Sequence, residues 1–228
     1  MKNSTAVLSK MEQYLDQWKS CNDSRLIFLN CYYLMSSNMV QAINNNEFHD
    51  TVWVNKLLCR FADYYFENLA CYDCGEAPSK IWEYTHKLTC ENKLSHIQAL
   101  ILGVNAHINY DLVLALHDVL KPEWDELSEE TKKIRYLDHS QVNRVIANTI
   151  DQVQDEVLEP LDPKLKWVDA LLGRLDEYLI SRLVTNWRED VWRNTQELMK
   201  FKEGHHYEIF RLQLETQALK KANTISIF

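Results

Sequence analysis

Residues 100–116 read LILGVNAHINYDLVLAL, and this stretch decides the fold that we expect for the chain. It is apolar on nearly every side of a helix, which is typical of a helix enclosed by its neighbours. The apolar pattern extends the expected central helix over about residues 93–120. Other helices must then surround it, so the sequence predicts an all-α bundle built around this segment.

Four polar residues interrupt the apolar stretch within seven positions: Asn105, His107, Asn109 and Asp111. A buried polar group that finds no partner costs about 1–3 kcal/mol, so an ordinary core helix would carry Leu or Ala there. At helical spacing His107 and Asp111 share one face, with Gly103 one turn before them. The two asparagines share a different face. We therefore expect one ionisable patch and one amide patch on the central helix, with room beside the glycine for a ligand or another backbone.

The rest of the chain predicts about seven to nine helices in one domain over residues 1–228. Gly and Pro number four each, too few for the frequent turns of an all-β fold. The best candidate for a linker is EPLDPK at residues 159–164, which contains two of the four prolines. Apolar periodicity places helices at about 5–20, 23–43, 50–69, 79–88, 93–120, 138–157, 164–184 and 186–220.

Composition and charge narrow the class of function and the compartment. The net charge is −8 and no Lys/Arg stripe is present, which argues against a nucleic-acid binder. The N-terminal sequence lacks a signal peptide pattern, and polar residues interrupt the one long apolar stretch, so we expect no membrane span. Six cysteines without a secretory signal indicate reduced thiols. We expect a soluble cytoplasmic protein whose partner is a small molecule.

Further candidate site residues lie outside the central helix. Asp138 and His139 precede a predicted helix, and Asn143 follows His139 by one turn. Asp50 opens the third predicted helix. Both aspartates are also good N-cap residues, and each reading stays open. Arg188 could bind an anionic group, balance a buried carboxylate, or lie on the surface.

Several of these positions resemble the motifs of an uncharacterised bacterial family, domain of unknown function 5995. The segment GVNAHINYDL at residues 103–112 is similar to the family's G-x-N-A-H-I-x-x-D-L signature. The resemblance covers about residues 35–200 and implies no reaction. Three shorter motifs of the family are matched by Phe48, Asp50 and Trp53, by Asp138, Val142 and Asn143, and by Arg188 and Trp192.

A looser similarity links the His107-x-x-x-Asp111 pair to helical zinc-dependent phospholipases C and single-strand nucleases. Those proteins place such a pair on a core helix to hold a metal ion, and His117 follows Asp111 at a comparable distance. The N-terminal tryptophan ligand of that group is absent here. The similarity implies a metal site on the central helix.

The leading hypothesis is a metal-dependent hydrolase of a small anionic or ester substrate. A bound ion would lower the pKa of a water molecule and stabilise charge in the transition state. Mixed imidazole and carboxylate ligands suit zinc, iron or manganese. The candidate ligands are His107, Asp111, Asp138, His139 and Asp50, and the residues expected to orient the substrate are Asn105, Asn109, Asn143 and Arg188.

Two alternatives remain open from the same residues. The first is a metal-free cyclase or isomerase acting on an apolar small molecule in a biosynthetic pathway. There His107 would be the general base and Asp111 would orient it. The second is a non-catalytic binding or scaffold protein, in which the buried polar groups fix the register of the helices. A bound metal, or a deep cavity beside His107, would distinguish these hypotheses.

Overall fold

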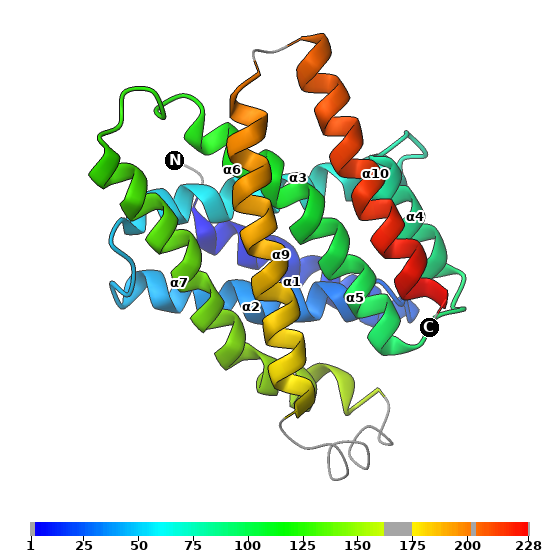
Figure 1. The fold of residues 1–228 in the computed structure, drawn as a ribbon. Helices are drawn as coiled ribbons and strands as arrows, with labels where there is room; N and C mark the ends of the chain where they lie inside the picture. The colour runs from blue at the N-terminus through cyan, green and yellow to red at the C-terminus, as the bar shows by residue number, and fades with distance from the viewer. Residues whose placement is uncertain (1–2, 162–174, 202–203, 228) are drawn as a thin grey trace.

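The computed structural model describes residues 3–161, 175–201 and 204–227, and Figure 1 shows their arrangement. Every regular element in these ranges is a helix, which confirms the all-α prediction. The first half of the chain forms α1 (Ser4–Cys21), α2 (Leu26–Asn44), α3 (Thr51–Asp73) and α4 (Lys80–Cys90). The second half forms α5 (His96–Ala106), η1 (His107–Asp111), α6 (Leu112–Leu120), α7 (Glu129–Val153), η2 (Gln154–Leu158), α9 (Leu175–Met199) and α10 (His205–Ile227).

The elements α5, η1 and α6 form one continuous helix over His96–Leu120, and this is the predicted central helix. Helices from both ends of the chain pack around it, namely α2, α3, α4, α9 and α10 (Figure 1). Counting it as one helix and η2 as the end of α7, the described residues form eight helices, within the predicted seven to nine.

Among the described residues this is the one helix long and apolar enough to cross a membrane, and 89% of its most apolar window is buried inside the protein. Burial of that kind is what the core helix of a bundle requires.

Polar side chains mark the beginnings of several helices. The side chain of Asn3 accepts a hydrogen bond from the backbone of α1, and that of Ser128 accepts one from the backbone of α7. Ser95 and Gln98 form a reciprocal capping box at the start of α5. Asp50 caps α3 by accepting from the Trp53 backbone N–H at 2.9 Å, which is one of the two roles that its sequence position left open.

The structure corrects three predicted helix boundaries. The helix expected to begin at Asp138 begins at Glu129, because Ser128 supplies the cap and acidic residues follow it in the first turn. Asp138 therefore lies in the interior of α7. The expected break near residue 185 is also wrong, since α9 continues to Met199. The helix expected at 186–220 is instead divided, because α9 ends at Met199 and α10 begins at His205, after Gly204, whose φ of 139° favours glycine.

Two sequence predictions fall partly on residues outside the described ranges. Of the linker expected at 159–164, only residues 159–161 are described, and they form a turn after η2. Of the helix expected at 164–184, residues 164–174 lie outside the described part, and the remainder belongs to α9.

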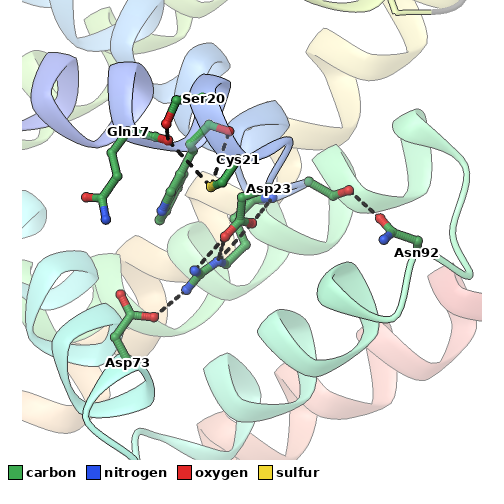
Figure 2. A network of polar contacts seen from close by, with 9 residues as sticks. Gln17, Ser20, Cys21, Asp23, Asp73 and Asn92 are labelled. Atoms are coloured by element: carbon green, nitrogen blue, oxygen red, sulfur yellow. Dashed lines mark hydrogen bonds and ion pairs between the residues drawn. The ribbon is translucent and has the colours of Figure 1, made fainter.

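A polar network joins the turn between α1 and α2 to two other parts of the chain (Figure 2). Arg25 forms an ion pair with Asp23 at 2.6 Å and a second with Asp73, at the end of α3, also at 2.6 Å. The Ser24 hydroxyl bonds with Asn92, in the turn after α4. These contacts fix the first helical hairpin against α3 and α4, and they are structural.

Candidate active site

The centre of the long helix is a π-helical turn at His107–Asp111, the segment that carries the ionisable pair. The backbone N–H of Leu112 bonds to the carbonyl of His107, an i→i+5 hydrogen bond in place of the α-helical i→i+4 bond. Such turns are rare in proteins, and those that occur are often found at functional sites. All five residues of the turn are buried.

Within this turn His107 and Asp111 contact each other as the sequence predicts. The His107 Nδ1 atom lies 2.9 Å from Asp111 Oδ2, and the side chains are 4% and 0% exposed. Trp82 on α4 donates its indole N–H to the same carboxylate oxygen at 2.8 Å. Asp111 thus holds the imidazole ring, and Trp82 holds Asp111.

Each member of the pair also has a buried polar atom without a hydrogen bond to any described residue. These atoms are His107 Nε2 and Asp111 Oδ1. Native structures pair the great majority of their buried polar atoms, and an exception requires an explanation such as a ligand or a catalytic role. Of the two residues, only His107 lines the cavity described below, so its Nε2 is the atom placed to bind or react with a ligand there.

Burial sets the charges of the pair. It lowers the pKa of His107 well below the usual value, because an imidazolium would be poorly solvated there. It also raises the pKa of Asp111 well above the usual value, although the hydrogen bond from Trp82 acts in the opposite direction. Both shifts oppose a charged side chain and so keep the imidazole neutral at neutral pH.

Aromatic rings enclose the imidazole of His107. Phe61 is stacked on it with ring centroids 3.6 Å apart, and Tyr32 meets it at 4.4 Å and 67°. The space beside Gly103, expected to admit a ligand or backbone, is occupied by the Phe28 ring. A Cβ at Gly103 would come within 3.0 Å of that ring, so the glycine is required for this packing.

His107 lines a cavity of about 310 Å³ that lies between α2, α3, α7, α9 and the central helix. This volume is within the range of small-molecule sites. Nearly all of its described lining is apolar, including Met35, Leu57 and Val142. The lining residues Ile97, Ile180 and Leu183 are exposed, so the cavity reaches from the surface to the buried histidine.

A second cluster of polar residues lies at the cavity wall, with members from α7 and α9. Arg188 donates from Nε to the Asn143 side-chain oxygen at 2.8 Å and from Nη2 to the His139 carbonyl at 2.6 Å. His139 Nε2 lies 3.0 Å from the Arg188 carbonyl, which links the two helices. Arg188 and His139 line the cavity, whereas Asn143 does not.

Burial shifts the pKa values of this second cluster as well. It lowers the pKa of Arg188 to about 10 and that of His139 well below its usual value. The adjacent guanidinium lowers the pKa of His139 further. His139 is thus neutral, and Arg188 is a buried cation.

Asp138 has a structural role that its sequence position did not reveal. Its carboxylate, which is fully buried, accepts hydrogen bonds from the backbone N–H groups of His49 and Asp50 at 2.8 and 2.9 Å. Asp50 in turn forms an ion pair with Arg135 at 2.6 Å. Asp138 therefore stabilises the start of α3 from the interior of α7, instead of capping its own helix.

The amide patch predicted on the central helix forms, but it faces α10 and does not line the cavity. Asn109 donates to the Asn105 side-chain oxygen at 3.0 Å, and Asn105 donates to the Ala218 carbonyl at 3.0 Å. Lys221 donates to Asn109 at 2.6 Å. These bonds give both asparagines partners within the protein, so they fix the register between the central helix and α10.

The predicted metal ligands are distributed over three places: His107 with Asp111, Asp138 with Asp50, and His139 with Arg188. Across the described ranges no group of three His, Cys, Asp or Glu side chains has an arrangement that could hold a metal ion. His117 contacts Tyr207 and joins none of these groups. Zinc, iron or manganese binding stays a prediction.

Sequence reasoning missed Trp82, Phe61 and Tyr32 as residues of this site. Trp82 is 29 residues from Asp111, and no local spacing relates the two. Only a chemical argument could have predicted a partner such as Trp82, because a buried aspartate needs more than one hydrogen-bond donor. Aromatic residues at helical spacing otherwise indicate only core packing.

The fold and the site together define an all-α protein with a buried His–Asp pair beside an apolar cavity. The chain belongs to the family of unknown function DUF5995, whose family model matches residues 4–226. This match confirms the resemblance carried by the motifs. Comparisons with curated proteins and with solved structures gave no match, and nothing supports the looser similarity to zinc-dependent phospholipases C.

Proposed function

We propose that this protein is an acid–base enzyme, an isomerase or cyclase, that moves a proton on an apolar small molecule bound in the cavity. One observation carries the proposal: His107 has a buried ring nitrogen without a partner among the described residues, in the wall of an apolar cavity. Its other ring nitrogen is held by a buried carboxylate. A base that is oriented in this way is a recurrent feature of proton-transfer sites.

The arrangement gives each residue a role. With its proton on Nδ1, His107 donates to Asp111 and presents a lone pair at Nε2. The lowered pKa keeps the imidazole neutral and able to accept a proton. When Nε2 takes up a proton, His107 keeps its hydrogen bond to Asp111 through Nδ1, and the indole N–H of Trp82 keeps the Asp111 side chain in position. The apolar lining excludes water and strengthens these interactions.

The reaction that we infer conserves the atoms of the substrate. Nε2 removes a proton from a carbon next to a double bond, the electron pair of the broken C–H bond forms a new double bond, and the π electrons of the old double bond move to its far carbon. Nε2 then returns a proton to a second carbon. An isomerisation results directly, and a cyclisation results if the new electron density forms a carbon–carbon bond before the proton returns.

The two other hypotheses find less support in this geometry. A scaffold needs no cavity at its buried polar groups, and His107 lines one, whereas His86, whose buried Nε2 also lacks a partner among the described residues, does not. A metal-dependent hydrolase would be expected to bring at least three ligands together, and the described residues provide only pairs. The scaffold interpretation fits the amide patch, and the acid–base interpretation fits the ionisable one.

The test uses deuterium as a label, so the substrate need not be known in advance. The protein is incubated in D2O with an organic-solvent extract of its source cells, and apolar molecules are analysed by mass spectrometry. We expect deuterium incorporation, or a change in isomer composition, that His107→Gln and Asp111→Asn abolish while circular dichroism shows intact helices.

His86→Gln is the matched control, because His86 is a buried histidine that does not line the cavity. The control should retain the activity of the wild type. Equal activity in His107→Gln, or no change in any extract component with wild-type protein, would contradict the proposed function.

A further inference from the structure

Arg188 is a buried cation that has no carboxylate partner within the described part of the chain. Arg188 is only 5% exposed. Its hydrogen bonds nevertheless go to uncharged groups, namely an amide oxygen, a backbone carbonyl and a neutral imidazole. These bonds use Nε and Nη2, and Nη1 forms none with a described residue. By contrast, the equally buried Arg135 forms ion pairs with Asp50 and Glu123.

A buried charge without a counter-charge is costly, and proteins usually pair it. Asn143 and His139 solvate the Arg188 guanidinium but supply no negative charge. The lowered pKa of Arg188 reflects the same deficit. A negatively charged ligand group in the cavity would supply the missing counter-charge.

The lining of the cavity indicates what kind of anion would fit. Arg188 is the one Lys or Arg side chain among the described lining residues, which suits a single negative charge. Asp138 also lines the cavity, but its oxygens are occupied by the backbone of His49 and Asp50. The remaining surface is almost entirely apolar, and it suits a hydrocarbon chain or ring system.

We propose that the ligand of this cavity is an amphipathic monocarboxylic acid, whose carboxylate binds Arg188 and whose apolar body extends along the cavity toward His107. The inference rests on the proposed function only in taking the cavity as the ligand site. The Nη1 group of Arg188, which bonds to no described residue, can donate a charge-assisted hydrogen bond to a carboxylate.

The first experiment compares acids with neutral ligands of the same shape. Binding of saturated fatty acids from octanoate to hexadecanoate, below their micellar concentrations, is measured by isothermal titration calorimetry against the corresponding methyl esters. We expect at least one acid to bind roughly 10- to 100-fold more tightly than its ester, as a charge-assisted hydrogen bond provides.

Variants assign that preference to Arg188. Asn143→Asp places a carboxylate where the amide oxygen now accepts from Arg188 Nε, so it should neutralise the cation and abolish the preference for the acid. Arg188→Gln should abolish it by removing the charge. Arg60→Gln removes a cation from α3 that does not line the cavity, and it should leave the preference unchanged.

The outcomes separate this inference from the proposed function. Equal affinity for acids and esters overturns the carboxylate headgroup but leaves an apolar ligand site. If neither acids nor esters bind, both the carboxylate headgroup and the apolar ligand site are overturned. Preferential acid binding that is lost in Asn143→Asp, without any proton transfer in the deuterium assay, supports the ligand class and contradicts the enzyme. If Arg188→Gln fails to fold, the acid–ester comparison in the wild type and in Asn143→Asp still decides.

Discussion

The ring of Phe61 lies parallel to the imidazole of His107, with 3.6 Å between the ring centroids and 7° between the ring planes. Phe61 comes from α3 and His107 from the π-helical turn, so the contact joins two elements that are far apart in sequence. It covers one face of the imidazole, while Tyr32 approaches at an angle. The stack thus orients the ring and keeps water from it, and both effects can be measured.

Phe61→Leu should uncover the imidazole and raise the pKa of His107 toward its usual value, because burial is what lowers it. The measurement is a pH titration of the ring nitrogens by 15N NMR. Phe66→Leu is the control, since Phe66 lies on the same helix but does not line the cavity. Both variants should lose stability of the order of 1–2 kcal/mol, from lost packing. An unchanged His107 titration in Phe61→Leu would show that the stack has no electrostatic role.

Asp138→Asn should destabilise the protein more than Asp50→Asn does. The change replaces one oxygen of the fully buried Asp138 carboxylate by an amide NH2, so at least one backbone N–H at the start of α3 loses its acceptor, which costs about 1–3 kcal/mol. Asn is itself a good N-cap, so Asp50→Asn keeps the cap and loses only a partly exposed ion pair, about 1 kcal/mol or less. Urea denaturation measures both, and the reverse order would refute the assigned role of Asp138.

Gly103→Ala should cost about 1–3 kcal/mol, as overpacking of a filled core does, because the new Cβ would meet the Phe28 ring. Phe28→Ala removes the two ring atoms, Cγ and Cδ2, that the new methyl group would approach most closely. The double variant should therefore be more stable than the sum of the two single changes implies, and a double-mutant cycle measures the coupling. Strict additivity would mean that the backbone, and not Phe28, accommodates the methyl group.

His86 should make the protein less stable in acid. Burial lowers the pKa of His86 to about 3, against about 6.5 in an unfolded chain. The unfolded state therefore binds more protons below about pH 6.5, and the stability that is fully present above this pH is lost as the pH falls. The slope contributed by one such histidine is about 1.4 kcal/mol per pH unit.

His86→Phe should remove that contribution, so the stability of the variant should fall less between about pH 7 and pH 5 than that of the wild type. Phe keeps a ring on Trp82, which His86 stacks against at 5.1 Å. It also deletes a buried nitrogen without a partner among the described residues. Parallel pH profiles of the two proteins, from urea denaturation, would refute the shift.

Short-range spacing predicted the contacts within the central helix. The pairs His107–Asp111 and Asn105–Asn109 are each four residues apart, and both are hydrogen-bonded. The apolar pattern also predicted the enclosing bundle, because a helix without a polar face must be covered. Local helical geometry was therefore enough to predict that this helix is buried and that its polar residues pair.

Contacts between distant residues could not be predicted in the same way. Asp138 is a good N-cap residue in sequence, but the group that it stabilises is 88 residues away along the chain. Arg188 was equally consistent with a surface position, and only the packing of α7 on α9 makes it a buried cation. The cavity likewise depends on five packed elements and has no local signal.

The π-helical turn sets the angular phase between the two halves of the central helix. It accommodates one residue more than an α-helical turn, so α6 is rotated by roughly 100° from where uninterrupted winding would place it. Deletion of a single residue such as Ile108 would restore regular winding and turn every later side chain to a different neighbour. The length of this segment, counted in residues, is therefore as much a part of the site as the identities of His107 and Asp111.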